Sequence, residues 1–114
     1  MFAKIWIIII WTTMTKNLFK IKSEVWLYPE MPGRWHFASV PKKQSEAIRK
    51  SFGEMKRGWG SLPVRITLGK TSWRTSIFPD KKSGTYLFSL KSEVRRKEGI
   101  QAGDIKTFAI EIKV

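Results

Sequence analysis

The fold of this chain is decided by the stretch Tyr86-Leu87-Phe88-Ser89-Leu90-Lys91-Ser92-Glu93-Val94-Arg95-Arg96-Lys97-Glu98-Gly99-Ile100-Gln101-Ala102-Gly103-Asp104. It predicts an apolar strand, a short basic helix that ends at Gly99, and a tight Gly-Asp turn into a last strand. The same order of features occurs earlier, in WHFASVP at residues 35–41 followed by SEAIRK at residues 45–50. We interpret the two stretches as copies of one unit that must pair to bury a common core. The second half is expected to begin with the loop at residues 58–63 and the strand that follows it.

Alternation of apolar and polar residues indicates that the rest of the chain is mainly β. In the first strand, a buried face alternates with a solvent-facing set of Lys20, Lys22, Glu24 and Trp26. We expect six strands and two helices. The strands are predicted over residues 18–28, 35–40, 64–68, 71–78, 85–90 and 105–112, and the helices over residues 42–52 and 92–97. Residues 58–63 and 79–84 are predicted as loops because they are rich in Gly, Pro, Asp and Ser. The first helix is expected to bury Ala47, Ile48, Phe52 and Met55. Many non-local strand pairings favour a small closed or nearly closed barrel.

Length and composition indicate one folded domain, which we place at residues 18–114. A chain of 114 residues with 42% apolar residues, six Trp and seven Phe is large enough for a single hydrophobic core. The absence of cysteine excludes disulfides, thiolate metal sites and a Cys nucleophile. Nothing in the composition indicates an oxidising compartment, so we expect a cytoplasmic protein.

Residues 1–17 differ from the rest and are interpreted as a leader, or a mis-called start, outside the domain. Seven consecutive apolar residues begin at Ile5, far fewer than the roughly 20 that a transmembrane helix needs. Lys4 precedes this run as in a signal peptide, but no small-residue cleavage site follows Trp11. Met14 is a second candidate start, and a short added strand or a membrane-touching anchor are the alternatives.

The net charge of +13, with a pI near 10.4, gives the folded protein a positive field. Such a field attracts nucleic acid, anionic lipid or acidic proteins, and the attraction weakens with salt. The alternative is a soluble basic protein whose charges are simply solvated.

The sequence gives little support to an enzyme, a metal site or a cofactor. The single histidine, His36, lies on a predicted strand between two aromatic residues and has no identifiable acid or nucleophile as a partner. Asp80 and Asp104 both fall in predicted turns, where Asp commonly bonds to the backbone. The glutamates are scattered among basic residues without metal-ligand spacing. We therefore expect no catalytic residues, no metal and no cofactor.

Several motifs in order resemble a known family: WGSLPV at residues 59–64, GKTSWRTSIFP at residues 69–79, LKSEVRR at residues 90–96, and Gly103-Asp104. They are similar to the bacterial and archaeal family called domain of unknown function nineteen-oh-five, over about residues 18–114. That resemblance implies a double-split β-barrel capped by two short helices, and no established activity. The closing unit also resembles the swapped-hairpin repressors and antitoxins of the AbrB and MazE type, which bind DNA as dimers.

Our first functional hypothesis is a non-catalytic module that binds nucleic acid or another anionic partner. Basic residues would neutralise phosphates while Trp59 and Trp73 offer faces for base stacking. It predicts micromolar binding of duplexes that falls steeply with salt. The candidate anion-binding residues are Arg65, Lys70, Arg74, Arg95, Arg96 and Lys97.

The second hypothesis is a barrel that binds a small molecule as a sensor or as an accessory domain of an enzyme. Its candidate cleft is lined by Trp59, Trp73 and Phe78. Against both hypotheses, Trp73 alternates with Ile77 as a core residue would, and basic residues at alternate strand positions commonly protect sheet edges. The oligomeric state is left open.

Overall fold

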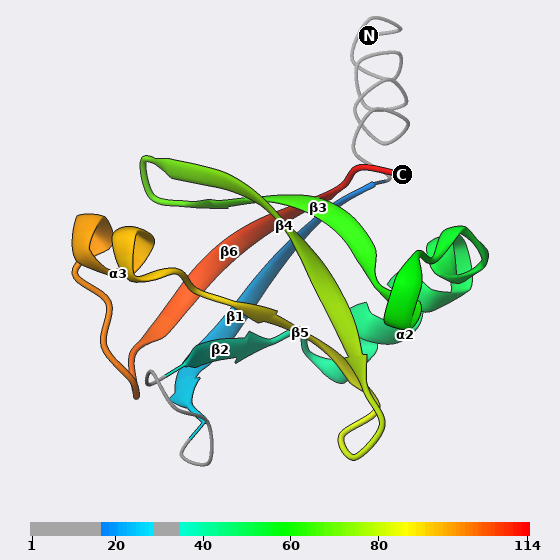
Figure 1. Cartoon of the computed structure of the whole chain (residues 1–114), viewed down its shortest axis with the longest axis horizontal. Helices are drawn as coiled ribbons and strands as arrows, with labels where there is room; N and C mark the ends of the chain where they lie inside the picture. Colours follow the sequence, from blue (N-terminus) through cyan, green and yellow to red (C-terminus); the bar gives the residue numbers. More distant parts are fainter. Residues whose placement is uncertain (1–16, 29–34) are drawn as a thin grey trace, which may run out of the picture.

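The computed structural model describes residues 17–28 and 35–114, and the predicted leader lies outside this part except for Asn17. Asn17 is tied to the last strand, because its Nδ2 donates to the Ile112 carbonyl and its own carbonyl accepts the Ile112 N–H. Figure 1 shows the elements in order. They are β1 (Leu18–Leu27), β2 (His36–Ser39), α2 (Lys42–Phe52), η1 (Gly53–Met55), η2 (Gly58–Gly60), β3 (Leu62–Leu68), β4 (Thr71–Asp80), β5 (Thr85–Ser89), α3 (Ser92–Glu98) and β6 (Ile105–Ile112).

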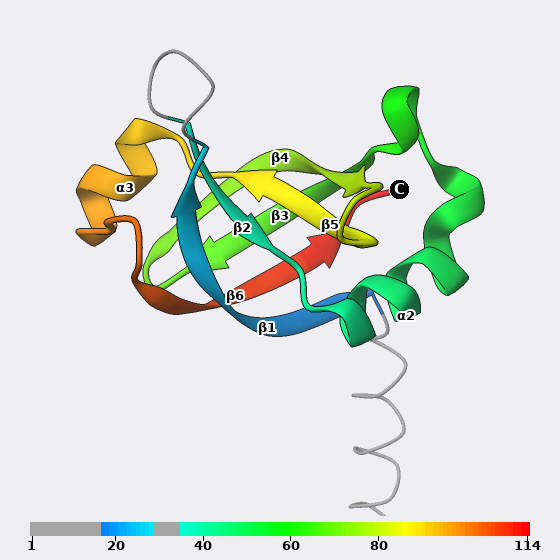
Figure 2. The same ribbon diagram turned by 90° about the horizontal axis from the view of Figure 1, so that it is seen from below.

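The six strands form a closed antiparallel barrel in the order β1-β2-β5-β4-β3-β6. This confirms the prediction of a mainly β fold with six strands and two helices. The helices α2 and α3 lie at opposite ends of the barrel (Figures 1 and 2). In the described part of the chain, no helix is both long and apolar enough to cross a membrane.

The ring of strands has an internal two-fold relation. Exchanging β1 with β4, β2 with β5 and β3 with β6 leaves the strand order unchanged. The repeated units are therefore β1-β2-α2-β3 and β4-β5-α3-β6, and each unit inserts its third strand beside the first strand of the other. Sequence reasoning had placed β3 in the second unit, which is wrong. Strand periodicity reports which face is buried but not which neighbour a strand pairs with.

The two units meet at the β2–β5 pair, where Ala38 lies opposite Phe88. The Val40 N–H donates to the Tyr86 carbonyl at 2.8 Å, and the Leu90 N–H donates to the His36 carbonyl at 2.9 Å. The two-fold relation that exchanges the two units converts each of these hydrogen bonds into the other. They relate Val40 to Leu90 and His36 to Tyr86, which is the correspondence that the repeated sequence motif predicts.

The core fills the barrel interior with alternate residues of every strand. Phe88 and Phe108 are fully buried and meet edge to face, with ring centroids 5.1 Å apart. Ile66, Ile77 and Ile110 are also fully buried. The helices close the two ends of the barrel. Ile48 is a buried residue of α2, and Val94 is a buried residue of α3.

Strand ends are where the structure differs most from the prediction. β4 continues through Pro79 and Asp80, which were predicted to be loop, and pairs them with Tyr86 and Thr85. Proline is tolerated there because β3 flanks β4 only as far as Ile77, so Pro79 lies at an open edge. The loop predicted before β3 contains η2, and β3 begins two residues early. β1, β2 and β5 are shorter than predicted, and α3 extends to Glu98.

The buried face of α2 also differs from the prediction. Ala47 is exposed and Met55 is 53% exposed, whereas Ser45 is fully buried beside Ile48. The Ser45 hydroxyl donates to the Val40 carbonyl at 2.9 Å and accepts the Tyr86 N–H at 3.0 Å. A buried polar side chain is stable only with such partners, so this serine ties α2 to both strands of the central pair.

We predict that Ser45→Ala lowers the free energy of unfolding by about 1–3 kcal/mol, because it leaves the buried Tyr86 N–H without an acceptor. Ser51→Ala is the matched control, since Ser51 lies on the same helix and is exposed. Urea unfolding followed by tryptophan fluorescence measures both. Equal stability of the two variants would contradict the role assigned to Ser45.

Candidate functional site

Four aromatic side chains gather on the outer surface of β1 and β2 and the residues that adjoin them. Trp26 lies directly opposite Phe37 in the strand register, on the face opposite the buried pair Val25 and Ala38. Tyr28 and Trp35 extend the same face, and the Tyr28 N–H donates to the Trp35 carbonyl. We call Trp26, Tyr28, Trp35 and Phe37 the aromatic face.

Phe37 is the centre of this aromatic face. Its ring centroid is 5.2 Å from that of Trp26 and 6.3 Å from that of Trp35, and both pairs are stacked. Tyr28 meets Phe37 edge to face at 6.1 Å. Trp35 is 47% exposed, although burial of large aromatic rings is strongly favourable. The other three rings are half-buried. A partly exposed cluster of aromatic rings on a sheet is typical of an interaction surface.

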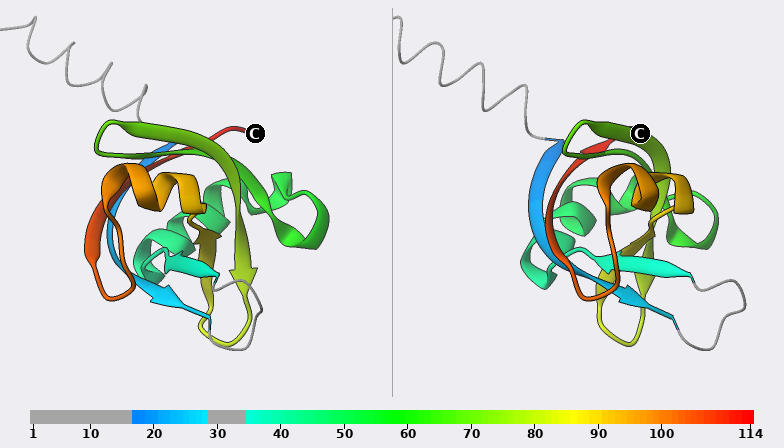
Figure 3. Two further views of the ribbon diagram at one scale, coloured as in Figure 1. Left: turned by 60° about the vertical axis from the view of Figure 1, so that its left-hand side comes forward. Right: turned by 90° about the vertical axis from the view of Figure 1, so that its left-hand side faces the viewer.

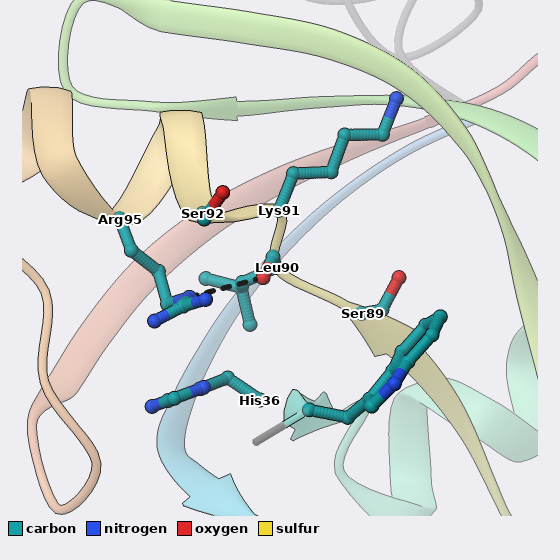
Figure 4. A pocket seen from close by; sticks show the side chains of 7 residues that line it. His36, Ser89, Leu90, Lys91, Ser92 and Arg95 are labelled. Carbon is teal, nitrogen blue, oxygen red and sulfur yellow. Dashed lines mark hydrogen bonds between the residues drawn. The ribbon is translucent and has the colours of Figure 1, made fainter. Parts of the chain in front are cut away.

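A pocket of about 370 Å³ borders the aromatic face at the α3 end of the barrel. Figure 4 shows His36 entering it from β2 and Arg95 from α3, with Lys91 extending from the junction of β5 and α3. Of the described residues, seven line the pocket and none of them is acidic. They are Trp35, His36, Ser89, Leu90, Lys91, Ser92 and Arg95.

Backbone and side-chain bonds fix the two walls of this pocket. The His36 carbonyl accepts the Leu90 N–H, which holds β2 against the chain entering α3. Arg95 Nε donates to the Leu90 carbonyl at 3.2 Å, as drawn in Figure 4. Arg95 is thereby oriented by the strand end that it follows, and its guanidinium lies at the pocket rather than extended into solvent.

At the same end of the barrel as the pocket, a hydrogen bond joins α3 to the β3–β4 hairpin. The Thr71 hydroxyl donates to the Glu98 carboxylate, and Figure 3 shows α3 lying beside the hairpin. Gly69 makes the close approach possible, because a Cβ atom there would clash with that carboxylate. Its φ of +58° also favours glycine.

The structure places the six predicted anion-binding residues in two groups. Lys70, in the hairpin turn, lies at the α3 end together with the three basic residues of α3, and Lys97 forms an ion pair with Glu93 at 3.2 Å. Arg65 and Arg74 lie opposite each other on the exposed side of β3 and β4. The α3 residues of this set are Arg95, Arg96 and Lys97.

Positive charge is not confined to these two groups. Exposed Lys42, Lys43 and Lys50 make the α2 end basic as well, and Lys20 and Lys22 lie on the exposed side of β1. Charge therefore supplies attraction over much of the surface but does not by itself single out one end. The α3 end carries the stacked rings of the aromatic face beside the pocket, whereas the exposed rings of Trp59 and Phe78 lie toward η2.

The structure does not bring the three predicted cleft residues together. Trp73 lies opposite Ile66 and packs against the core, and its buried indole N–H has no hydrogen-bond partner among the described residues. Phe78 lies five residues after Trp73 on the same strand. Side chains alternate between the two faces of a strand, so Phe78 points to the outer face, and it is 45% exposed. Trp59 is 91% exposed in η2, beside the far end of β4.

Sequence reasoning missed the aromatic face because it treated Trp26 as a solvent-facing residue of an alternating strand. The useful signal is spacing: Trp26 and Tyr28 are two residues apart, and so are Trp35 and Phe37. Residues two apart share one face of a strand, and consecutive strands pair often. Together these facts place four rings on one surface.

Both aspartate side chains accept hydrogen bonds from nearby residues, as expected of Asp in a turn. The Ser83 hydroxyl and N–H donate to Asp80 Oδ2 at 2.7 and 3.2 Å, and the hydroxyl bond is the main cause that lowers the pKa of the Asp80 carboxyl. The Gln101 N–H donates to Asp104 Oδ2 at 2.9 Å. Within residues 17–28 and 35–114, no group of three or more acidic or histidine side chains is placed to hold a metal ion.

We predict that Thr71→Val lowers the free energy of unfolding by about 1–2 kcal/mol, because a bond from a hydroxyl to a carboxylate is lost at a partly buried position. Ser72→Ala, which removes only the exposed bond between Ser72 and Thr67, should cost less than about 0.5 kcal/mol. Chemical denaturation measures both. Equal losses would show that the bond to Glu98 does not hold the hairpin to α3.

Comparison with known proteins confirms the family that the sequence motifs resemble. The family described as Domain of unknown function (DUF1905) matches this chain over residues 22–110, which includes the aromatic face, the pocket and both helices. A search of curated proteins finds no match to the chain. The protein therefore belongs to the DUF1905 family.

Proposed function

We propose that this domain is a non-catalytic module that binds single-stranded nucleic acid at the α3 end of the barrel. Bases stack on the aromatic face, and the backbone phosphates lie near the cations of the pocket and of α3. The observation that carries the proposal is that Trp35, the exposed ring of the stacked aromatic face, also lines the pocket together with Lys91 and Arg95.

Base stacking explains why single strands are the preferred partner. Each base that stacks on an aromatic side chain contributes about 1–3 kcal/mol, and the contribution depends little on sequence. In a duplex the faces of the bases already cover one another, so the aromatic face has less to bind. The proposal therefore departs from the duplex binding that the charge alone predicts.

The net charge of +13 supports the same partner at longer range. A positive field raises the rate of encounter with a polyanion and makes its affinity dependent on salt. The α2 end shares this field, but none of the four rings of the aromatic face lies on α2. Charge thus attracts the strand, and the aromatic face determines where it binds.

Support for a role without catalysis comes from the side chains of the pocket. Arginine, lysine and serine donate hydrogen bonds to an anion, and the acidic groups of the two predicted turns are engaged by their own backbone. Among the residues that the structure describes, those that line the pocket are suited to holding a phosphate, and none of them is a carboxylate.

We predict that Trp35→Ala weakens binding of a short fluorescent oligothymidine by about tenfold at low salt, because one stacking surface is lost. Trp59→Ala is the matched control, since Trp59 is 91% exposed and lies away from α3. Fluorescence anisotropy measures both variants. Equal weakening by the two substitutions would contradict the proposed location.

The same titration repeated at increasing salt tests the electrostatic part of the proposal. The logarithm of the association constant should fall linearly with the logarithm of salt concentration, by about 0.7 for each phosphate contacted. A duplex of the same length should bind more weakly than the single strand. Absence of any binding at low ionic strength would exclude the proposed function.

A further inference from the structure

We infer that the pocket between β2 and α3 is a binding site for a phosphate monoester. This inference goes beyond the stacking of bases on the aromatic face, because a terminal phosphate carries more charge than a phosphate within a strand. A phosphate monoester has a charge of about −1.5 to −2 at neutral pH and three strong acceptor oxygens.

The residues of the pocket match this chemistry. Arg95 offers a planar guanidinium, which suits bidentate bonds to phosphate oxygens. Lys91 adds positive charge to the lining, although its side chain extends away from Arg95 in Figure 4. The hydroxyls of Ser89 and Ser92 are further donors. Trp35 provides a flat apolar wall, so the group that bears the phosphate can itself be an aromatic ring such as a nucleobase.

The internal two-fold relation shows that the fold does not require this pocket. The Ser45 N–H donates to the Pro41 carbonyl and the Arg95 N–H to the Lys91 carbonyl, which makes Ser45 the counterpart of Arg95. At the α2 end, Ser45 is fully buried and its hydroxyl donates to the carbonyl five residues earlier. A small serine is therefore sufficient to complete the junction between strand and helix.

Arg95 satisfies the same structural need with one of its donors. Its Nε donates to the Leu90 carbonyl, again five residues earlier, as the Ser45 hydroxyl does to Val40. A guanidinium has five N–H donors, so this bond uses only a small part of its capacity. At the α2 end of the barrel this position is a buried serine. At the α3 end the equivalent residue is an arginine whose guanidinium lies at a pocket.

Two sources of a phosphate monoester fit this site: a free nucleotide and the 5′-phosphorylated end of a strand. Adenosine monophosphate and adenosine test the first, and oligothymidine with a 5′-phosphate or a 5′-hydroxyl tests the second. In each pair the members differ only in the terminal phosphate. A difference in affinity within a pair therefore reports on the phosphate and not on stacking.

The experiment measures the four ligands by calorimetry and anisotropy against the full chain, Arg95→Ser and Arg96→Ser. Arg95→Ser copies the residue that the fold uses at Ser45, and circular dichroism verifies that it folds. Arg96→Ser removes the same charge from the next position of α3, outside the pocket. We expect the phosphorylated member of at least one pair to bind about tenfold tighter than its partner. Arg95→Ser should abolish that advantage, and Arg96→Ser should retain it.

Each outcome decides the inference separately from the proposed function. An advantage seen only with oligonucleotides identifies a strand end as the source, and one seen also with adenosine monophosphate identifies a free nucleotide. No advantage in either pair, or an advantage that survives Arg95→Ser, overturns the phosphate site. Binding of the 5′-hydroxyl strand in that case leaves the proposed function standing.

Discussion

The structure depends on the exchange of strands between two equivalent units. Among the strands that the structure describes, β3 pairs with β4 and β6, and β6 pairs with β1 and β3. The third strand of each unit therefore lies between strands of the other unit. The two bonds between β2 and β5, from Val40 to Tyr86 and from Leu90 to His36, join the units at their centre. The backbone hydrogen bonds of each third strand are therefore made with the other unit, so neither unit alone can satisfy them.

Duplication gives the barrel two equivalent ends, and side chains at equivalent positions make them different. At the α2 end, Ser45 is buried and the Arg49 guanidinium lies 5.6 Å from the ring centroid of Tyr86. At the α3 end, His36 takes the place of Tyr86 and Arg95 that of Ser45, and both line a pocket together with Trp35. The backbone of the two ends is equivalent, and the side chains make them different; the proposed binding site uses that difference.

The sequence predicted what depends on local periodicity and left open what depends on neighbours. Both helices and all six strands follow from spacing, and the repeated motif predicted the correspondence of β2-α2 with β5-α3. The membership of β3 in the first unit did not follow, because pairing is non-local. Sequence reasoning grouped Trp73 with Phe78 although their odd spacing places them on opposite faces. The burial of Ser45 was not predictable, since its acceptor and donor lie on two different strands.

The central claim is that one end of a two-fold barrel has become the binding end. The most direct measurement is a titration of the isotopically labelled protein with oligothymidine, followed by amide and indole chemical shifts in two-dimensional NMR. The account predicts that the largest shifts occur at Trp26, Trp35, Phe37, Lys91 and Arg95, and that the amides of α2 stay unchanged. Equal shifts at both ends, or shifts centred on α2, would contradict it.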